Sequence, residues 1–456
     1  MKQIPVEVGK TYDLHIEDLS HDGLGLARVD GFLVFVKDAL PGERVRARMT
    51  HVKKKYAHGT VLIRETTSEN RVKPACDLFS QCGGCQIQHL DYEGQLVFKK
   101  SIVTRNLEKF ADLVDPPVLD VIGMDDPWRY RNKTQVPVGR NGEGDVVAGF
   151  YKSRSHEIVD MPHCLVQSEV ADAIVERVRQ LAVEFGIEPY DEEASRGCLR
   201  HVVIRKGFKT GEVMVIFVTR ESLLPYQDEI ISALICDFPS IKSIVHNVNP
   251  KVTNVIFGEE TKLIYGASYM VDALDGLKFL ISPRSFYQVN PVQTEVLYQK
   301  ALAYAEVGEN DVVFDAYCGI GTITLFLARQ AKAVYGVEIV SDAIRDARKN
   351  AELNGLDNVN FEVGKSEVVI PKWILEGIVP DVIVVDPPRK GCDGVLLEAM
   401  IQAKPKKIVY VSCDSATLAR DIKILSEGGY KLKVVQPVDM FPMTSHIECV
   451  ALLKLR

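Results

Sequence analysis

The sequence has no long apolar run. No segment reaches the ~18 consecutive apolar residues that a membrane-spanning helix needs, although the chain has 456 residues. The opening residues, Met1-Lys2-Gln3-Ile4-Pro5, are not followed by the apolar core of a secretory signal peptide. We therefore expect a cytoplasmic protein that does not span the membrane.

Internal repeats and low-complexity segments are also absent, which excludes solenoids, propellers and long disordered tracts. Apolar residues make up 46% of the chain and charged residues 26%, as in an ordinary globular protein. At roughly 100–200 residues per domain, the length predicts two to four domains. Nothing in the sequence indicates an obligate protein partner.

An excess of positive charge is missing from the chain as a whole. The formal net charge is −7, which by itself argues against binding to nucleic acid. However, residues 44–73 hold nine Lys and Arg against Glu65 and Glu69, a local charge of 9 − 2 = +7. Local basic patches, not net charge, bind phosphates, although a solvated basic face is the alternative. The hypothesis is that phosphates contact Lys53, Lys54 and Lys55.

The N-terminal residues 5–66 contain short strand-like runs at 6–16, 31–36, 44–51 and 59–63, which glycine turns separate. This pattern predicts an OB-like barrel, which is a common platform for oligonucleotides. The stretch from Asp22-Gly23-Leu24-Gly25 through Val34-Phe35-Val36 to Pro41-Gly42-Glu43 resembles the TRAM domain of RNA-modifying enzymes.

Two segments follow with less specific patterns. Residues 94–110 are predicted to form an ordinary packing helix, since Leu96, Val103, Leu107 and Phe110 have helical spacing, with Lys99 and Lys100 off that face. In residues 128–133, aromatic residues alternate with Arg and Lys, which suits stacking on unpaired bases. A core strand is the alternative for Trp128 and Tyr130.

The chain becomes α/β from about residue 310. Apolar strand-like runs at 311–316, 333–337, 382–385 and 407–411 alternate with helical patterns at 322–330 and 341–354. This alternation predicts a parallel, doubly wound sheet. Upstream, residues 125–270 are predicted to be mainly β with helices, including a hairpin of 201–205 with 212–219.

A glycine turn joins the first of these strands to its helix, in Asp315-Ala316-Tyr317-Cys318-Gly319-Ile320-Gly321-Thr322. A dinucleotide-binding fingerprint would need a third glycine where Thr324 stands. The turn instead resembles motif I of class I S-adenosylmethionine-dependent methyltransferases. Glu338 ends the next strand, where an acid can bind ribose hydroxyls. Asp386-Pro387-Pro388-Arg389 has the position of motif IV in those enzymes.

Residues that are absent from motif IV limit which base the enzyme can be expected to methylate. Enzymes that methylate adenine amino groups usually have an aromatic residue where Arg389 stands, and cytosine-C5 enzymes usually have a cysteine directly after a proline there. Downstream, Cys413 lies at the carboxyl end of a predicted strand, the edge where α/β sheets hold their chemistry. An inert buried thiol is the alternative for a lone cysteine.

Three further cysteines lie close together, as Cys76, Cys82 and Cys85. Cys-x-x-Cys is a common metal-ligand spacing, and the fourth ligand is left open by the sequence. Zinc is one alternative for this site. The radical S-adenosylmethionine signature begins with a three-residue gap, and the five-residue gap here argues against radical chemistry.

Taken together, the motifs resemble the bacterial 23S rRNA uracil-5-methyltransferases of the RumA/RlmD type over nearly the whole chain. The motifs that carry this resemblance are Ser282-Pro283-Arg284-Ser285-Phe286-Tyr287-Gln288-Val289-Asn290, the glycine turn, Asp386-Pro387-Pro388-Arg389-Lys390-Gly391, Ser412-Cys413 and residues 441–448.

The resemblance implies specific roles. Cys413 is the expected nucleophile and Glu448 the expected general base. Expected contacts to S-adenosylmethionine are made by Gln288, Tyr317, Gly319, Gly321, Glu338 and Asp386. A structural [4Fe–4S] cluster is expected on Cys76, Cys82, Cys85 and Cys164.

The implied domains are a TRAM-like RNA-binding barrel at 1–67, a central α+β iron–sulfur and RNA-binding domain at 68–280 and a Rossmann-like methyltransferase domain at 281–456. The helix near 88–119 is expected to pack with the catalytic domain. The implied substrate is a flipped or unpaired uridine of 23S rRNA, since a base inside a duplex is unreachable. A tRNA uridine-54-type methyltransferase and a non-catalytic RNA-binding iron–sulfur protein are the alternatives.

Overall fold

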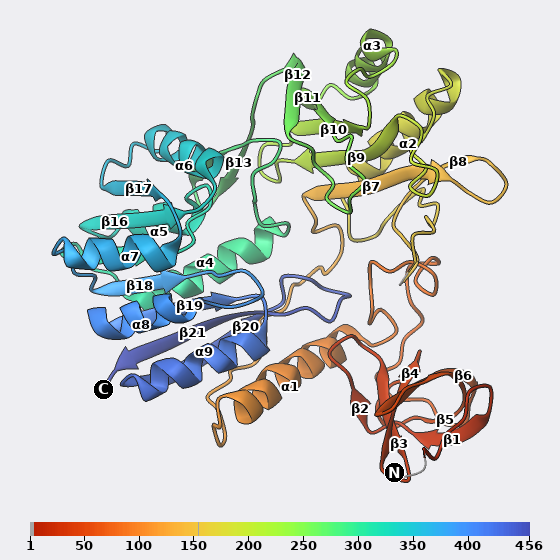
Figure 1. The fold of residues 1–456 in the computed structure, drawn as a ribbon, viewed down its shortest axis with the longest axis horizontal. Helices are drawn as coiled ribbons and strands as arrows, with labels where there is room; N and C mark the ends of the chain where they lie inside the picture. The colour runs from red at the N-terminus through yellow and green to blue at the C-terminus, as the bar shows by residue number, and fades with distance from the viewer. Residues whose placement is uncertain (1–3, 154) are drawn as a thin grey trace.

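The computed structural model describes residues 4–153 and 155–456, and these form three large sheets and a two-stranded one. Figure 1 shows the N-terminal barrel, a central sheet and a larger C-terminal sheet arranged around the middle of the molecule. No helix in these two ranges is long and apolar enough to cross a membrane.

The N-terminal sheet has six strands in the order β1-β5-β6-β4-β3-β2. Side chains along β5 alternate between the two faces of the sheet: Val45, Ala47 and Met49 are buried, whereas the arginines at 44, 46 and 48 are exposed. The strands are β1 (Thr11–His15), β2 (Asp18–Leu19), β3 (Gly25–Val29), β4 (Phe32–Lys37), β5 (Arg44–Val52) and β6 (Tyr56–Arg64).

The central sheet has the strand order β12-β11-β10-β9-β7-β8, with α2 and α3 packed on one face. The predicted hairpin is confirmed as the antiparallel pair β9 and β10. The elements are β7 (Lys133–Arg140), β8 (Val146–Ala148), α2 (Glu169–Glu184), β9 (Leu199–Lys206), β10 (Val213–Thr219), α3 (Gln227–Asp237), β11 (Ile241–Val248) and β12 (Glu260–Gly266).

A two-stranded hairpin, β13 (Met270–Leu274) with β14 (Leu277–Ile281), leads into the C-terminal sheet. This seven-stranded sheet has the order β17-β16-β15-β18-β19-β21-β20. Its first five strands are parallel, as predicted, whereas β21 is antiparallel to both neighbours, so the sheet is mixed. The strands are β15 (Val312–Asp315), β16 (Ala333–Glu338), β17 (Val359–Val363), β18 (Val382–Val385), β19 (Lys407–Ser412), β20 (Tyr430–Val438) and β21 (Glu448–Leu455).

Helices cover both faces of this sheet. One face packs against α4 (Pro291–Ala305), α5 (Thr322–Ala328) and α6 (Ser341–Leu353). The other packs against α7 (Ser366–Leu375), α8 (Gly394–Ala403), α9 (Ser415–Glu427) and α1 (Tyr92–Phe110). Thus α1 precedes the central sheet in the chain but buries Val103 and Leu107 in the core of the C-terminal sheet, beside α9 (Figure 1).

The sequence prediction for Lys99 is wrong. Lys99 is fully buried on the inner face of α1, where its ammonium group pairs with Asp439, while Phe110 is 40% exposed. Helical spacing explains this result, because Lys99 precedes Val103 by four residues and therefore shares its face.

Candidate active site

The C-terminal sheet brings the predicted site residues to one edge. Asp315 ends β15, Glu338 ends β16, Asp386 follows β18 and Cys413 follows β19. Because these four strands are parallel, their carboxyl ends lie side by side, as expected for the binding edge of an α/β sheet.

Glu448 reaches the same edge from the opposite direction. Strand β21 is antiparallel to β19, and its register places Cys449 opposite Ser412. The first residue of β21, Glu448, therefore lies beside Cys413, the residue that follows β19. This pairing depends on the strand register and has no counterpart in local sequence spacing.

At this edge of the sheet, burial and nearby negative charge favour the protonated, uncharged forms of the Cys413 thiol and the Glu448 carboxyl group. Burial, with the charges of Glu448 and Asp386, raises the pKa of Cys413 to about 12. Burial and the neighbouring charge of Asp386 raise the pKa of Glu448 well above its usual range. Arg389 opposes both shifts. The Oε2 atom of Glu448 is buried without a hydrogen-bond partner, so a donor is missing at this position.

The glycine turn has the backbone that a close ligand approach requires. Gly319 and Gly321 have φ of 55° and 84°, in the left-handed region that favours glycine. Thr324, where a dinucleotide fingerprint would have glycine, donates from Oγ1 to Asp315 Oδ2 at 2.6 Å. Thr324 thus ties the first turn of α5 to the end of β15, and burial raises the pKa of Asp315 to about 6.

Two of the other expected cofactor residues lie in or beside this turn. Tyr317 lies within the turn, and Glu338 Oε1 accepts a hydrogen bond from the backbone of Val340 at 2.9 Å. Gln288 is 7% exposed and lies between β14 and α4, where its carbonyl accepts a hydrogen bond from Asn132 Nδ2 at 3.0 Å.

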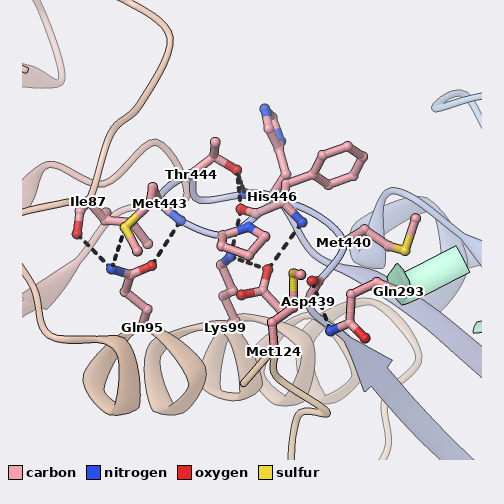
Figure 2. A network of polar contacts seen from close by, with 12 residues as sticks. Ile87, Gln95, Lys99, Met124, Gln293, Asp439, Met440, Met443, Thr444 and His446 are labelled. Atoms are coloured by element: carbon pink, nitrogen blue, oxygen red, sulfur yellow. Dashed lines mark hydrogen bonds and ion pairs between the residues drawn. The ribbon is translucent and has the colours of Figure 1, made fainter. Parts of the chain in front are cut away.

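The loop between β20 and β21 carries His446 and ends at Glu448, and α1 holds it from below (Figure 2). Lys99 Nζ donates to Asp439 Oδ1 at 2.6 Å and to the Phe441 carbonyl at 3.0 Å. Tyr92, also on α1, donates from its hydroxyl to Asp439 Oδ2 at 3.0 Å. The helix that packs with the C-terminal sheet therefore fixes the start of this loop.

The same loop is hydrogen-bonded to residues 73–87, the segment that carries Cys76, Cys82 and Cys85 (the cysteine segment). The carbonyl of Met443 accepts hydrogen bonds from the backbone amides of Gln86 and Ile87 at 3.1 and 3.2 Å, and Gln95 Oε1 accepts one from the Met443 amide at 3.0 Å. Met443 has φ of 69°, which is uncommon for a residue with a side chain. The residues directly after Cys85 thus hold the loop in a strained conformation.

Four cysteines line one cavity of about 250 Å³, namely Cys76, Cys82, Cys85 and Cys164. Burial raises the pKa of Cys85 to about 12 and that of Cys164 to about 11. Across the described ranges, no group of three or more His, Cys, Asp or Glu is arranged around a single metal ion.

A second cavity, of about 1050 Å³, connects the N-terminal barrel with the active-site edge. Its walls include Thr50, His51 and His58 from the barrel, Lys73 from the cysteine segment, and Cys413. Cys413 therefore opens into a space large enough for several nucleotides, and the barrel forms the far side of that space.

Comparison with known proteins identifies the family. The family model described as tRNA (Uracil-5-)-methyltransferase matches residues 245–456, and the TRAM domain model matches residues 5–62. A protein of Halalkalibacterium halodurans named as an uncharacterized RNA methyltransferase is 54% identical over 100% of this chain and 99% of its own length. A similarly named protein of Clostridium acetobutylicum is 48% identical over 99% of both chains. The chain belongs to the RNA uracil-5-methyltransferase family.

A solved relative of this RNA methyltransferase is the tRNA (uracil-54, C5)-methyltransferase of Pyrococcus abyssi, in complex with S-adenosyl-L-homocysteine. It is 30% identical, with a TM-score of 0.77 over 97% of this chain and 100% of its own. The fold of the uracil-5-methyltransferase is thus shared along its whole length, and the predicted TRAM domain and methyltransferase fold are confirmed.

In the basic stretch 44–73 of the methyltransferase, fewer cations are available to bind phosphate than the composition indicates, because several are paired with acids. Arg46 pairs with Asp13, and Arg64 and Arg71 both pair with the buried Glu43. Exposed cations without an ion pair in the described part of the chain remain at Arg44, Arg48, Lys53, Lys54, Lys55 and Lys73.

The stacking hypothesis for residues 128–133 is wrong for two residues. Tyr130 is 1% exposed and donates from its hydroxyl to the Pro442 carbonyl at 3.1 Å. The guanidinium group of Arg129 donates hydrogen bonds to Asp172 Oδ2 at 2.7 Å and to the carbonyls of Cys164 and Gln167. These side chains support the loop between β20 and β21 and the segment around Cys164, and they are not available for RNA bases.

Sequence reasoning missed Lys99 and Asp439, which position the loop. The signal for Lys99 was present in the helical spacing, as described above. Asp439 offered none, because nothing in its local sequence indicates that it is buried.

Proposed function

We propose that this protein methylates C5 of a uridine in 23S rRNA with S-adenosylmethionine, using Cys413 as nucleophile and Glu448 as general base. The observation that carries the proposal is the side-by-side arrangement of Cys413 and Glu448 at the carboxyl edge, beside Asp386, with one oxygen of Glu448 buried and unpartnered.

The residues account for each bond change. Sγ of Cys413 adds to C6 of uracil, which raises the electron density at C5. When bound, S-adenosylmethionine would supply the methyl group that C5 attacks and would leave as S-adenosylhomocysteine. Glu448 then removes the C5 proton, the C5–C6 double bond re-forms and Cys413 leaves as thiolate.

Proton affinities at this edge fit these roles. Because burial raises the pKa of Cys413 to about 12, the thiol proton leaves as Sγ attacks C6, and it is released to a base of the solvent through the cavity that Cys413 lines. Once ionised, a carboxylate such as Glu448, whose pKa is held high by burial, is a stronger base than an exposed one.

The chain also fits the cofactor. The turn at Gly319 and Gly321 allows close backbone approach, and Glu338 is an acid at the end of the second strand. We assign cofactor contacts to these residues and to Gln288, Tyr317 and Asp386.

The four cysteines fit a [4Fe–4S] cluster better than zinc. A zinc ion needs four ligands at about 2.3 Å from one point, whereas a cluster keeps its thiolates apart. The four thiols line one cavity of about 250 Å³, which gives a cluster room between them. Cys76, Cys82, Cys85 and Cys164 would hold the cluster, which would stabilise the segment that holds Met443.

A tRNA is the second candidate substrate, because the Pyrococcus abyssi enzyme, similar over the whole chain, acts on uracil-54 of tRNA. The two substrates are separated by mapping 5-methyluridine in 23S rRNA and in tRNA from a strain that lacks the protein. Loss of the mark from 23S rRNA alone supports the proposal, and loss from tRNA alone contradicts it.

The mechanism is tested with RNA that carries 5-fluorouridine at the target, which has no C5 proton to remove. The wild type should give a covalent protein–RNA band that persists in denaturant. Cys413→Ala should give no band and no methylation, whereas Cys236→Ala, which removes an exposed thiol, should behave as the wild type. A Cys413→Ala protein that still methylates uridine refutes the assignment.

A further inference from the structure

Two cations of the central sheet face each other without a counter-ion. Lys133 on β7 and Arg205 on β9 are directly opposite in the antiparallel register, so their side chains share one face of the sheet. Like charges in this arrangement destabilise a sheet. Neither residue forms an ion pair anywhere within residues 4–153 and 155–456.

Burial makes this pair more costly. Arg205 is 4% exposed, and its Nε atom is buried without a hydrogen-bond partner, while Nη2 donates to the Ser285 carbonyl. Burial, with repulsion from Arg205 and Arg131, lowers the pKa of Lys133 to about 8. A buried charge without a partner is strongly unfavourable, and such a group in a native fold requires an explanation.

The pair lies where the central sheet meets the active site. The amide of Asn132, next to Lys133, donates to the Val289 carbonyl at 2.9 Å, and its side chain donates to the Gln288 carbonyl. Arg205 contacts Ser285 of the same segment. Arg205 and the residue next to Lys133 therefore contact the stretch that leads into α4 and carries Gln288. Lys133 is partly exposed and gives access to the pair.

We propose that Lys133 and Arg205 form a binding site for a phosphodiester of the RNA substrate, close to the target uridine. A phosphate offers two charged oxygens to two cations and supplies the missing negative charge. This inference rests on the proposed function. The carboxylate of the cofactor has the same chemistry, and the test below separates the two sources.

The test uses Lys133→Met, which keeps the length of the side chain and removes its charge. RNA affinity should fall about tenfold, and the slope of log Kd against log salt should decrease by ~0.7, the value for one phosphate contact on a single strand. The midpoint of thermal unfolding should rise, because the repulsion with Arg205 is relieved. A residue with a structural role only would lower the midpoint.

RNA with one uncharged methylphosphonate linkage identifies the contact. Scanned over the linkages around the target uridine, one such substitution should weaken binding to the wild type but not to Lys133→Met. Lys242→Met, which removes an exposed lysine from β11 of the same sheet, is the matched control and should leave the salt slope unchanged.

Two results would overturn the site. One is an unchanged RNA affinity and salt slope in Lys133→Met. The other is weaker S-adenosylmethionine binding with unchanged RNA binding, which would assign the pair to the cofactor. Trapping on 5-fluorouridine RNA at saturating concentration should persist in Lys133→Met. If the wild type itself does not trap, the proposed function fails, and the affinity measurements still test the phosphate site.

Discussion

Replacing Lys99 by Met should release the loop that leads to Glu448. The ammonium group of Lys99 and the carboxylate of Asp439 are both fully buried, with Nζ 2.6 Å from Oδ1. Removing one partner of a buried pair leaves the other charge uncompensated, which costs about 3–5 kcal/mol. The variant also loses the bond from Nζ to the Phe441 carbonyl. We therefore expect a free energy of unfolding lower by about that amount, measured by urea denaturation.

The double variant Lys99→Met/Asp439→Asn should regain much of this loss, because it leaves no buried charge. Lys100→Met is the matched control: the neighbouring Lys100 pairs with the exposed Asp120, and such surface pairs contribute little. In single turnovers at saturating RNA, methyl transfer by Lys99→Met should slow while cofactor affinity is unchanged, since the glycine turn is untouched. Equal stability of the single variant and the Lys100→Met control would refute the argument, as would an unchanged rate of methyl transfer.

Three further predictions concern other parts of the molecule. Replacing Lys53, Lys54 and Lys55 by Gln should reduce the salt slope of RNA binding by about two to three, and an unchanged slope would remove these lysines from the interface. Protein purified without oxygen should be brown and contain about four irons, and Cys164→Ser should lose them; one zinc in colourless protein would contradict the cluster. Because burial and Asp315 raise the pKa of Asp386 to about 7, its charge is lost as pH falls through that value. Affinity for S-adenosylmethionine, a sulfonium cation, should therefore fall more steeply below about pH 7 than affinity for the neutral S-adenosylhomocysteine, as measured by calorimetry, and parallel pH profiles would argue against this contact.

Local patterns by themselves determined the family and much of the fold. Apolar runs that end at Asp315, Glu338 and Asp386 are short-range signals, because a buried strand must be apolar and the turn after it needs Gly or Pro. The strands β15, β16 and β18 end at or directly before these residues. The motifs likewise predicted an RNA uracil-5-methyltransferase with a TRAM domain, which the comparisons confirm.

The substrate was beyond the reach of such patterns. No local motif distinguishes 23S rRNA from tRNA, and the cavity between the barrel and Cys413 has walls that come from segments far apart in the chain. The basic stretch also overstated the free charge, since the acids that neutralise Arg64 and Arg71 are reached only after the barrel has formed.

Only the tertiary structure decided the contacts around the candidate active site. Lys99 and Asp439 are 340 residues apart in the chain, and nothing local to Asp439 predicts its burial. Cys413 and Glu448 lie next to each other because of the register between two antiparallel strands, β19 and β21. The local sequence around either residue does not indicate the other. The same holds for Lys133 opposite Arg205. The physical reason is that burial and pairing set the energy of a charge, and both come from groups that the chain brings together only when it folds.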